Sequence, residues 1–231
     1  MIRAVLFDLD DTLYPEEAFY RGGFAVVAAE LERRGIGPAD EIGQHMLRLH
    51  LGGSRPRVFD LAAERFGFSP SWVSELVSLF HGHEPRLSLY SDVRGVLERL
   101  GSRYHLGVVT DGHGGVQRRK IAALGVEPLV DAVVVADDFG RPYWKPHPRP
   151  FLACCQAIGV LPDEAVYVGD NPERDVAGAR SAGLLSIRMR RPDGFFRNAE
   201  EGSSGSAAHE VESLRELEEW LDLIAAETVV P

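Results

Sequence analysis

Short apolar runs, rich in valine, leucine and isoleucine, recur along most of the chain. They span residues 4–7, 106–109, 132–135, 165–168 and 185–187. Short apolar runs of this kind are typical of parallel strands that are buried on both faces. Amphipathic segments separate them, and in one of these we expect Asp92 to cap a helix that ends before Gly101. Alternating strands and helices predict an α/β fold with a doubly wound, Rossmann-like parallel sheet.

The pattern changes between residues 14 and 91. Apolar residues recur there at intervals of three and four positions, as at Phe24, Val27 and Leu31, and no strand pattern interrupts them. This spacing predicts an all-helical segment. We therefore expect two domains: an α/β core made of residues 1–13 and 92–231, and a helical domain made of residues 14–91 that is inserted after the first strand.

Charge and composition exclude some partners. The formal net charge of the 231 residues is −10, and lysine and arginine do not cluster along the chain. Because nucleic-acid binding depends on clustered cations, we expect no nucleic-acid partner. The N-terminal stretch has no signal-peptide pattern and no apolar run is long enough to cross a bilayer, so we expect a cytoplasmic protein without a membrane partner. The sequence does not indicate an oligomeric state.

Acidic, hydroxyl and basic residues directly follow the predicted strands or precede the helices between them. They occur in four short motifs: FDLDDTL at residues 7–13, VVTDG at 108–112, WKP at 144–146 and VGDNPERD at 168–175. In open parallel sheets, ligands bind beyond the carboxyl ends of the strands. We therefore expect the four motifs to meet in one acidic crevice.

Crowded carboxylates imply a cation in this crevice. The carboxylates in question are those of Asp8, Asp10, Asp170 and Asp175. They would repel one another, and any phosphate dianion, unless a divalent cation lay among them. Oxygen ligands of this kind favour Mg²⁺. With the charge offset, Asp8 could attack a phosphate whose oxygens accept hydrogen bonds from Thr110 and Lys145.

Each motif alone also has an ordinary structural interpretation. An Asp-x-Asp after a strand is often a solvated turn, Lys145 resembles any exposed lysine, and Asp175 could cap the helix that follows it. All four motifs nevertheless occur in order, at positions that a doubly wound sheet brings together. This placement favours one common site over four coincidences.

The four motifs resemble the ordered motifs of the haloacid dehalogenase-like hydrolase superfamily. The resemblance extends from residue 6 to about residue 188, and the inserted segment resembles the helical cap of the C1-capped phosphatase branch. It implies that Asp8 is the nucleophile and that Asp10 is the general acid and base. It also implies that the phosphate is bound by Thr110, Asp111 and Lys145.

The same resemblance places magnesium among Asp8, Asp170 and Asp175, with the backbone carbonyl of Asp10 as a further ligand. Asp11 departs from the family pattern, because many members carry glycine at this position. We expect this difference to affect the hinge of the cap rather than the chemistry.

The superfamily includes phosphatases, phosphomutases and dehalogenases, so the fold alone does not settle the reaction. Asp10 favours cleavage of a phosphate ester, because a departing alkoxide needs a proton and a halide does not. We therefore predict a magnesium-dependent phosphatase that forms an aspartyl-phosphate on Asp8. A phosphomutase or dehalogenase and a receiver-like phosphorylation switch are the alternatives. The receiver pattern fits less well, because it puts its phosphorylated aspartate on a middle strand and has no helical insertion of this size.

Substrate identity should depend on the cap and on the loops near the phosphate site. The candidate substrate-binding residues are Tyr14, Arg21, Arg55, Arg57 and His113. Each also has a simpler interpretation as a solvated surface residue. Residues 110–188 resemble N-acylneuraminate 9-phosphatase-like members of the branch, which implies a small sugar, nonulosonate or nucleotide phosphate as the substrate.

Overall fold

The computed structural model of the chain describes residues 1–200 and 205–227. It contains two compact units, Met1–Pro15 with Ser88–Pro231, and Glu16–Leu87. We call the first the core unit and the second the inserted unit. The sequence pattern places the corresponding boundaries between residues 13 and 14 and between residues 91 and 92.

The core unit contains a sheet of six parallel strands. In chain order they are β1 (Ala4–Phe7), β2 (His105–Thr110), β3 (Ala132–Val135), β4 (Ala165–Gly169), β5 (Leu185–Met189) and β6 (His209–Val211). Their order across the sheet is β3-β2-β1-β4-β5-β6, and every neighbouring pair is parallel. This order confirms the predicted doubly wound α/β fold, and its direction reverses between β1 and β4. Ligands of such sheets bind at the reversal.

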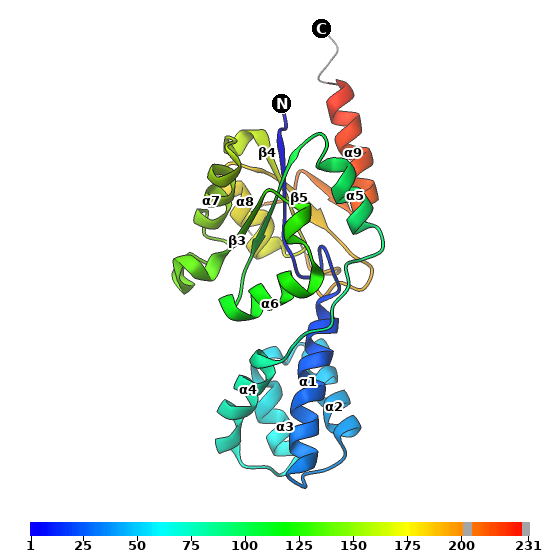
Figure 1. The fold of residues 1–231 in the computed structure, drawn as a ribbon, viewed down its shortest axis with the longest axis vertical. Helices are drawn as coiled ribbons and strands as arrows, with labels where there is room; N and C mark the ends of the chain where they lie inside the picture. Colours follow the sequence, from blue (N-terminus) through cyan, green and yellow to red (C-terminus); the bar gives the residue numbers. More distant parts are fainter. Residues whose placement is uncertain (201–204, 228–231) are drawn as a thin grey trace. The chain divides into compact units, whose positions relative to one another are not determined.

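Helices cover both faces of the sheet, as Figure 1 shows. They are α5 (Val93–Leu100), α6 (Gly114–Leu124), α7 (Arg149–Ile158), α8 (Ala177–Ser181) and α9 (Leu214–Glu227). α7 and α8 pack on one face, where Phe151 and Cys154 meet Leu6 and Tyr167 of the central strands. α5 and α9 pack against each other on the opposite face. Burial of these apolar side chains stabilises the sheet and fixes the positions of its strand ends.

The expected capping of α5 by Asp92 is wrong. No side-chain hydrogen bond joins Asp92 to this helix. Its carboxylate accepts instead from Arg191 Nη1, at 3.0 and 2.9 Å, and from the backbone N–H of Leu214 at 2.7 Å. Leu214 is the first residue of α9. Asp92 therefore stabilises the start of a helix that lies 122 positions further along the chain.

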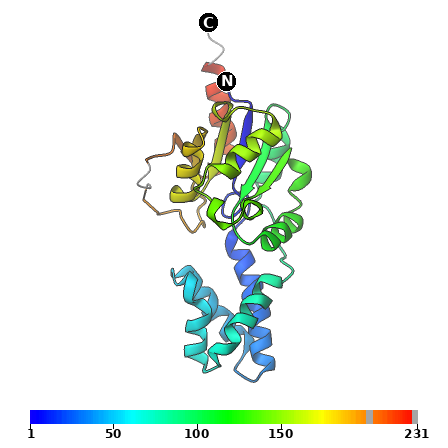
Figure 2. The same cartoon turned by 90° about the vertical axis from the view of Figure 1, so that its left-hand side faces the viewer.

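The inserted unit consists mainly of the helices α1 (Glu16–Arg33), α2 (Ala39–Leu51), α3 (Val58–Phe66) and α4 (Val73–Gly82), drawn in blue to cyan in Figure 2. Aromatic rings with centroids 5.2 to 6.2 Å apart form its core; they belong to Phe19, Tyr20, Phe24, Phe59 and Phe80. Gly23 lets α1 approach α4, because a Cβ there would lie 2.5 Å from the Phe80 ring. Among the described residues of both units, no helix combines the length and apolarity needed to cross a membrane.

Candidate active site

The first motif lies at the carboxyl end of β1, beside the reversal of strand order. The backbone N–H of Asp8 donates to the carbonyl of Val168 at 2.8 Å, so the pairing of β1 with β4 continues into the motif. Asp170 and Asp175 come from the segment that follows β4, and all three carboxylates are buried. The structure therefore brings the first and fourth motifs together.

Three carboxylates form a group that could hold a metal ion. One oxygen from each of Asp8, Asp170 and Asp175 lies within 4.8 Å of the other two. Acidic groups this close repel one another strongly when they are buried. A bound divalent metal ion would offset this repulsion, with carboxylate oxygens as its ligands. One oxygen of Asp175 also accepts from Lys145 at 2.7 Å and the other from the backbone N–H of Asn171 at 3.0 Å.

Lys145, from the third motif, supplies a positive charge to this group. Its ammonium donates to Asp8 Oδ1 at 2.6 Å, to Asp175 Oδ1 at 2.7 Å and to the Tyr167 hydroxyl oxygen at 3.0 Å. Burial by itself would lower the pKa of Lys145, but attraction to Asp175 and Asp8 outweighs it and raises the pKa well above its usual value. Lys145 is therefore a permanent cation in contact with the carboxylate after β1.

The ionisation of Asp8 depends on its neighbours. Burial raises the pKa of Asp8, Lys145 opposes the rise, and repulsion from Asp175 and Asp10 adds to it, so that the pKa lies well above its usual value. A nucleophilic carboxylate must be ionised. A second positive charge beside Asp8 would favour that form, which is an independent reason to expect a cation here.

Asp10 lies outside the three-carboxylate group. Its Oδ1 accepts from the Tyr14 hydroxyl and from Lys120 Nζ, the latter at 2.7 Å. The sequence predicted Tyr14 only as a contact for substrate, and it did not indicate Lys120 at all. The one available signal for Lys120 is its helical spacing, three positions after Gln117 on the buried face of α6. From the sequence we expected the Asp10 carboxylate to be one of four around the cation, but the group that the structure forms contains only Asp8, Asp170 and Asp175. The expected role of the Asp10 backbone carbonyl as a metal ligand stays a prediction.

The second motif ends β2 and is tied to α6 and to the loop of Lys145. The buried hydroxyl of Thr110 donates to Gln117 Oε1 at 2.9 Å. Asp111 Oδ1 accepts from the backbone N–H of Lys145 at 3.0 Å, and burial raises the pKa of Asp111. Gly112 has a φ of +118°, and a Cβ there would lie 2.8 Å from Gln117 Nε2. Asp111 thus helps to position Lys145.

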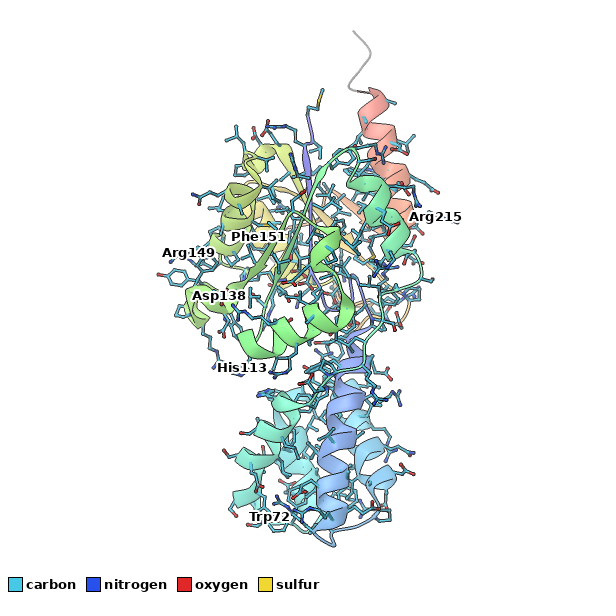
Figure 3. All side chains as sticks on the ribbon, in the orientation of Figure 1. Trp72, His113, Asp138, Arg149, Phe151 and Arg215 are labelled. Carbon is cyan, nitrogen blue, oxygen red and sulfur yellow. The ribbon has the colours of Figure 1, made fainter. Side chains whose placement is uncertain are left out.

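The remaining candidate residues make contacts of their own. His113 is exposed at the start of α6 and is labelled in Figure 3; its ring lies edge-to-face with that of Trp144, with centroids 6.4 Å apart. The three arginines belong to the inserted unit and pair within it: Arg21 with Glu17, Arg55 with Glu16 and Arg57 with Glu64. Their part in substrate binding stays a prediction.

Residues after β5 form hydrogen bonds with the loop that follows Asp10. Asp11 has a φ of +49°, in the left-handed region that aspartate tolerates better than most residues. Its Oδ2 accepts from the backbone N–H of Phe195 at 2.9 Å. Arg191 donates to the carbonyl of Thr12 at 3.2 and 3.1 Å. The backbone conformation explains why glycine suits this position, and the bond to Phe195 explains how aspartate is kept there.

The chain is similar to known phosphatases. A family model described as haloacid dehalogenase-like hydrolase matches residues 2–183. The chain is 36% identical over 207 residues to a glyceraldehyde 3-phosphate phosphatase from Methanopyrus kandleri, which covers 83% of this chain and 85% of the relative. It is 38% identical over 98 residues to N-acylneuraminate-9-phosphatase from Homo sapiens, covering 42% of this chain and 39% of the relative.

A solved structure is also similar to this chain. The HAD phosphatase from Thermococcus onnurineus matches with a TM-score of 0.65 and 31% sequence identity, over 95% of this chain and 98% of that one. Sequence and fold therefore agree on one family.

Proposed function

Because this chain belongs to the haloacid dehalogenase-like hydrolases and is a phosphatase of that family, we propose that it is magnesium-dependent and hydrolyses a small phosphate monoester through an aspartyl-phosphate on Asp8. The observation that carries the proposal is the buried group of Asp8, Lys145, Asp170 and Asp175. It provides a nucleophile, a permanent cation and oxygen ligands in one place. Phosphoryl transfer needs these three components.

The reaction proceeds in two displacements. In the first, a carboxylate oxygen of Asp8 attacks phosphorus while the bond from phosphorus to the leaving oxygen breaks, and Asp10 gives its proton to that oxygen. Lys145 stabilises the negative charge on the transferred group. In the second, water attacks phosphorus, Asp10 takes a proton from the water, and the bond to Asp8 breaks. Inorganic phosphate and the original carboxylate result.

The magnesium ion would be held by Asp8, Asp170 and Asp175, together with the backbone carbonyl of Asp10. Both oxygens of Asp175 also accept hydrogen bonds from the protein, one of them from Lys145. We therefore assign Asp175 a second role, that of holding Lys145. When bound, the ion offsets the charge of the carboxylates and of the incoming phosphate.

The alternatives explain less of the geometry. A dehalogenase expels a halide, which needs no proton, and would leave the hydrogen-bonded carboxylate of Asp10 without a function. A phosphomutase would have to exclude water from the intermediate, and no feature of the core-unit residues that the structure describes points to that. A receiver-like switch would not require a general acid at Asp10. Hydrolysis gives Asp8, Asp10 and Lys145 each a role.

For the substrate we propose a three-carbon sugar phosphate. The relative named for glyceraldehyde 3-phosphate is similar over 85% of its length, whereas the one named for an N-acylneuraminate phosphate is similar over 39%. Nonulosonate and nucleotide phosphates are the next classes to test. The inserted unit would act as a cap that closes over the substrate and sets specificity, with Arg21, Arg55 and Arg57 as candidates on it and His113 on the core unit.

A cytoplasmic location is part of the same proposal. Cys154 and Cys155 are both buried and unpaired, as is usual for proteins of a reducing compartment. Burial raises the pKa of Cys154 to about 12 and that of Cys155 to about 11. Both thiols are therefore inert core residues rather than chemical groups of the site.

Phosphate release from a panel of esters tests the function. The panel contains glyceraldehyde 3-phosphate, a nonulosonate 9-phosphate and a nucleoside monophosphate. We expect turnover with Mg²⁺, loss of turnover in excess chelator and recovery when Mg²⁺ is restored. Ca²⁺ should bind but support little turnover, because its looser coordination would misalign Asp8. Full turnover in excess chelator would reject the metal dependence, and no turnover of any ester would reject the phosphatase.

A further inference from the structure

We propose that Lys120 is a positioning residue for Asp10: it fixes one carboxylate oxygen so that the other exchanges the proton in both steps. The inference rests on the proposed function, because it assigns a role within that mechanism. Lys120 Nζ donates to Asp10 Oδ1 at 2.7 Å, across 110 positions of sequence. Tyr14 donates its hydroxyl to the same oxygen, and the Lys120 ammonium lies 5.9 Å from the centroid of the Tyr14 ring.

The burial of Lys120 distinguishes it from an ordinary helix lysine. Its side chain is 4% exposed, whereas that of Arg118, on the same helix, is 56% exposed and pairs with Asp138. Burying an ammonium is unfavourable unless a carboxylate compensates it. Gln117, three positions earlier, is also buried and accepts from Thr110. α6 therefore contributes one polar contact to each of the first two motifs.

The two donors to Asp10 converge on Oδ1. Within residues 1–200 and 205–227, no hydrogen bond to Oδ2 is found. With Oδ1 held twice, rotation of the carboxyl group is restricted and Oδ2 is left for proton exchange. A general acid must meet the leaving oxygen at hydrogen-bond distance, and a misplacement of about 1 Å can cost about 10²-fold in rate.

The proton balance of both steps involves Oδ2 alone. In the first step the Oδ2–H bond breaks, and the proton passes to the leaving oxygen as its bond to phosphorus breaks. In the second step Oδ2 takes a proton from the attacking water as the bond from that water to phosphorus forms. Lys120 keeps its own protons throughout and acts only by holding Oδ1.

Each of the two buried lysines contacts a different aspartate of the first motif. Lys145 contacts Asp8, and Lys120 contacts Asp10. A lysine that bound the substrate phosphate would serve every ester alike. A lysine that acts through Asp10 matters most when the leaving group needs a proton. Dependence on the leaving group therefore separates the two roles.

The test compares an aryl phosphate, whose phenolate leaves readily without an acid, with an alkyl phosphate, using the full chain with Mg²⁺. We expect Lys120→Met to lower kcat/KM for the alkyl ester by about 10- to 10²-fold more than for the aryl ester. Lys120→Arg, which keeps a cation at this position, should retain most of the kcat/KM that Lys120→Met loses with the alkyl ester. Arg118→Met, which removes an exposed cation from the same helix, should change neither value. In an Asp10→Asn background, Lys120→Met should cause no further loss with the alkyl ester.

Equal losses on both esters would overturn the proposal and indicate a phosphate-binding lysine. The proposal would also be overturned if Lys120→Met lowered kcat/KM for the alkyl ester as much in the Asp10→Asn background as in the unmutated protein. Thermal unfolding shows whether Lys120→Met is folded. If it is not, Tyr14→Phe, which removes the other donor to Oδ1, must lower kcat/KM for the alkyl ester more than for the aryl ester. Equal losses on the two esters in Tyr14→Phe would overturn the proposal. Absence of turnover in the unmutated protein on every ester would instead reject the proposed function itself.

Discussion

Several buried charges in the core unit contact charges of opposite sign. Examples are Lys145 with Asp8 and Asp175, Lys120 with Asp10, and Arg191 with Asp92. Because an unpaired buried charge is costly, removing one partner should affect folding as well as the reaction. A comparison of two esters on one variant avoids this problem, since the folded fraction is the same for both.

A buried histidine makes the stability of the inserted unit depend on pH. The ring of His50 stacks on that of Tyr20 with centroids 3.6 Å apart. Burial, together with repulsion from Arg55, lowers the pKa of His50 to about 3. In the unfolded chain this pKa returns to about 6.5. Between these values the unfolded state binds more protons than the folded state, so acid favours unfolding.

We therefore expect the free energy of unfolding to decrease as the pH falls below about 6.5, by at most about 1.4 kcal/mol per pH unit for this one proton. His50→Phe keeps an aromatic ring against Tyr20 and should remove that part of the slope. Urea denaturation over a series of pH values, followed by circular dichroism, measures both. If the free energy of unfolding of His50→Phe fell with decreasing pH as steeply as that of the unmutated protein, the pH dependence would belong to another group.

The loop of Lys145 is supported by the packing of α7 against α8. A Cβ at Gly178 of α8 would lie 2.6 Å from the Phe151 ring and 3.1 Å from the Cα of Pro146. Pro146 directly follows Lys145, and Phe151 packs against Tyr167 with ring centroids 4.7 Å apart. A side chain at position 178 would therefore press on the elements that place the ammonium and its hydroxyl partner.

Gly178→Ala is expected to lower the free energy of unfolding by about 1–3 kcal/mol, the usual cost of overpacking, and to reduce kcat for aryl and alkyl esters alike. Gly115→Ala is the matched control, because a Cβ there meets Arg119 Nη1 at an ordinary 3.7 Å. Denaturant unfolding and steady-state kinetics measure both variants. Unchanged stability of Gly178→Ala would show that Phe151 moves aside without cost.

The two chain segments that lead to the inserted unit, which contain Asp11 and Tyr90, both contact the loop after β5. On one side, Asp11 accepts from the backbone N–H of Phe195. On the other, the Tyr90 hydroxyl donates to Asp193 Oδ1 at 2.9 Å, and Arg191 lies 4.2 Å from the centroid of the Tyr90 ring. These contacts give the expected influence of Asp11 on the hinge a physical route, and that influence stays a prediction.

Much of the whole molecule follows from local patterns in the sequence. The central strands are predictable because they contain short apolar runs, as in β1 and β4, and parallel strands in a doubly wound sheet align their carboxyl ends. Motif residues that follow such runs, among them Asp8 and Asp170, therefore meet without any knowledge of the packing. Helical spacing likewise indicates α5, where Val96 and Leu100 are buried on one face.

Contacts between distant positions account for what the sequence did not reveal. From the sequence, Lys120 looks like a solvent-facing lysine of a helix, whereas in the structure it is buried and its ammonium donates to Asp10, 110 positions away. Asp92 satisfies the local rule for a cap, but its partners lie 99 and 122 positions along the chain. Tyr167 lies in a strand pattern, which does not show that its hydroxyl meets Lys145. Local periodicity reports burial, not the partner of a buried polar group.

In the proposed mechanism, Asp8 is phosphorylated during turnover. Asp10→Asn offers the most direct measurement, because an aryl phosphate can still phosphorylate Asp8 while hydrolysis of the intermediate stalls. Rapid acid quenching and mass-spectrometric mapping should find phosphate on Asp8, and the Asp8→Asn, Asp10→Asn double variant should carry none. Phosphate mapped to another residue, or turnover by Asp8→Asn near the rate of the unmutated protein, would contradict the account.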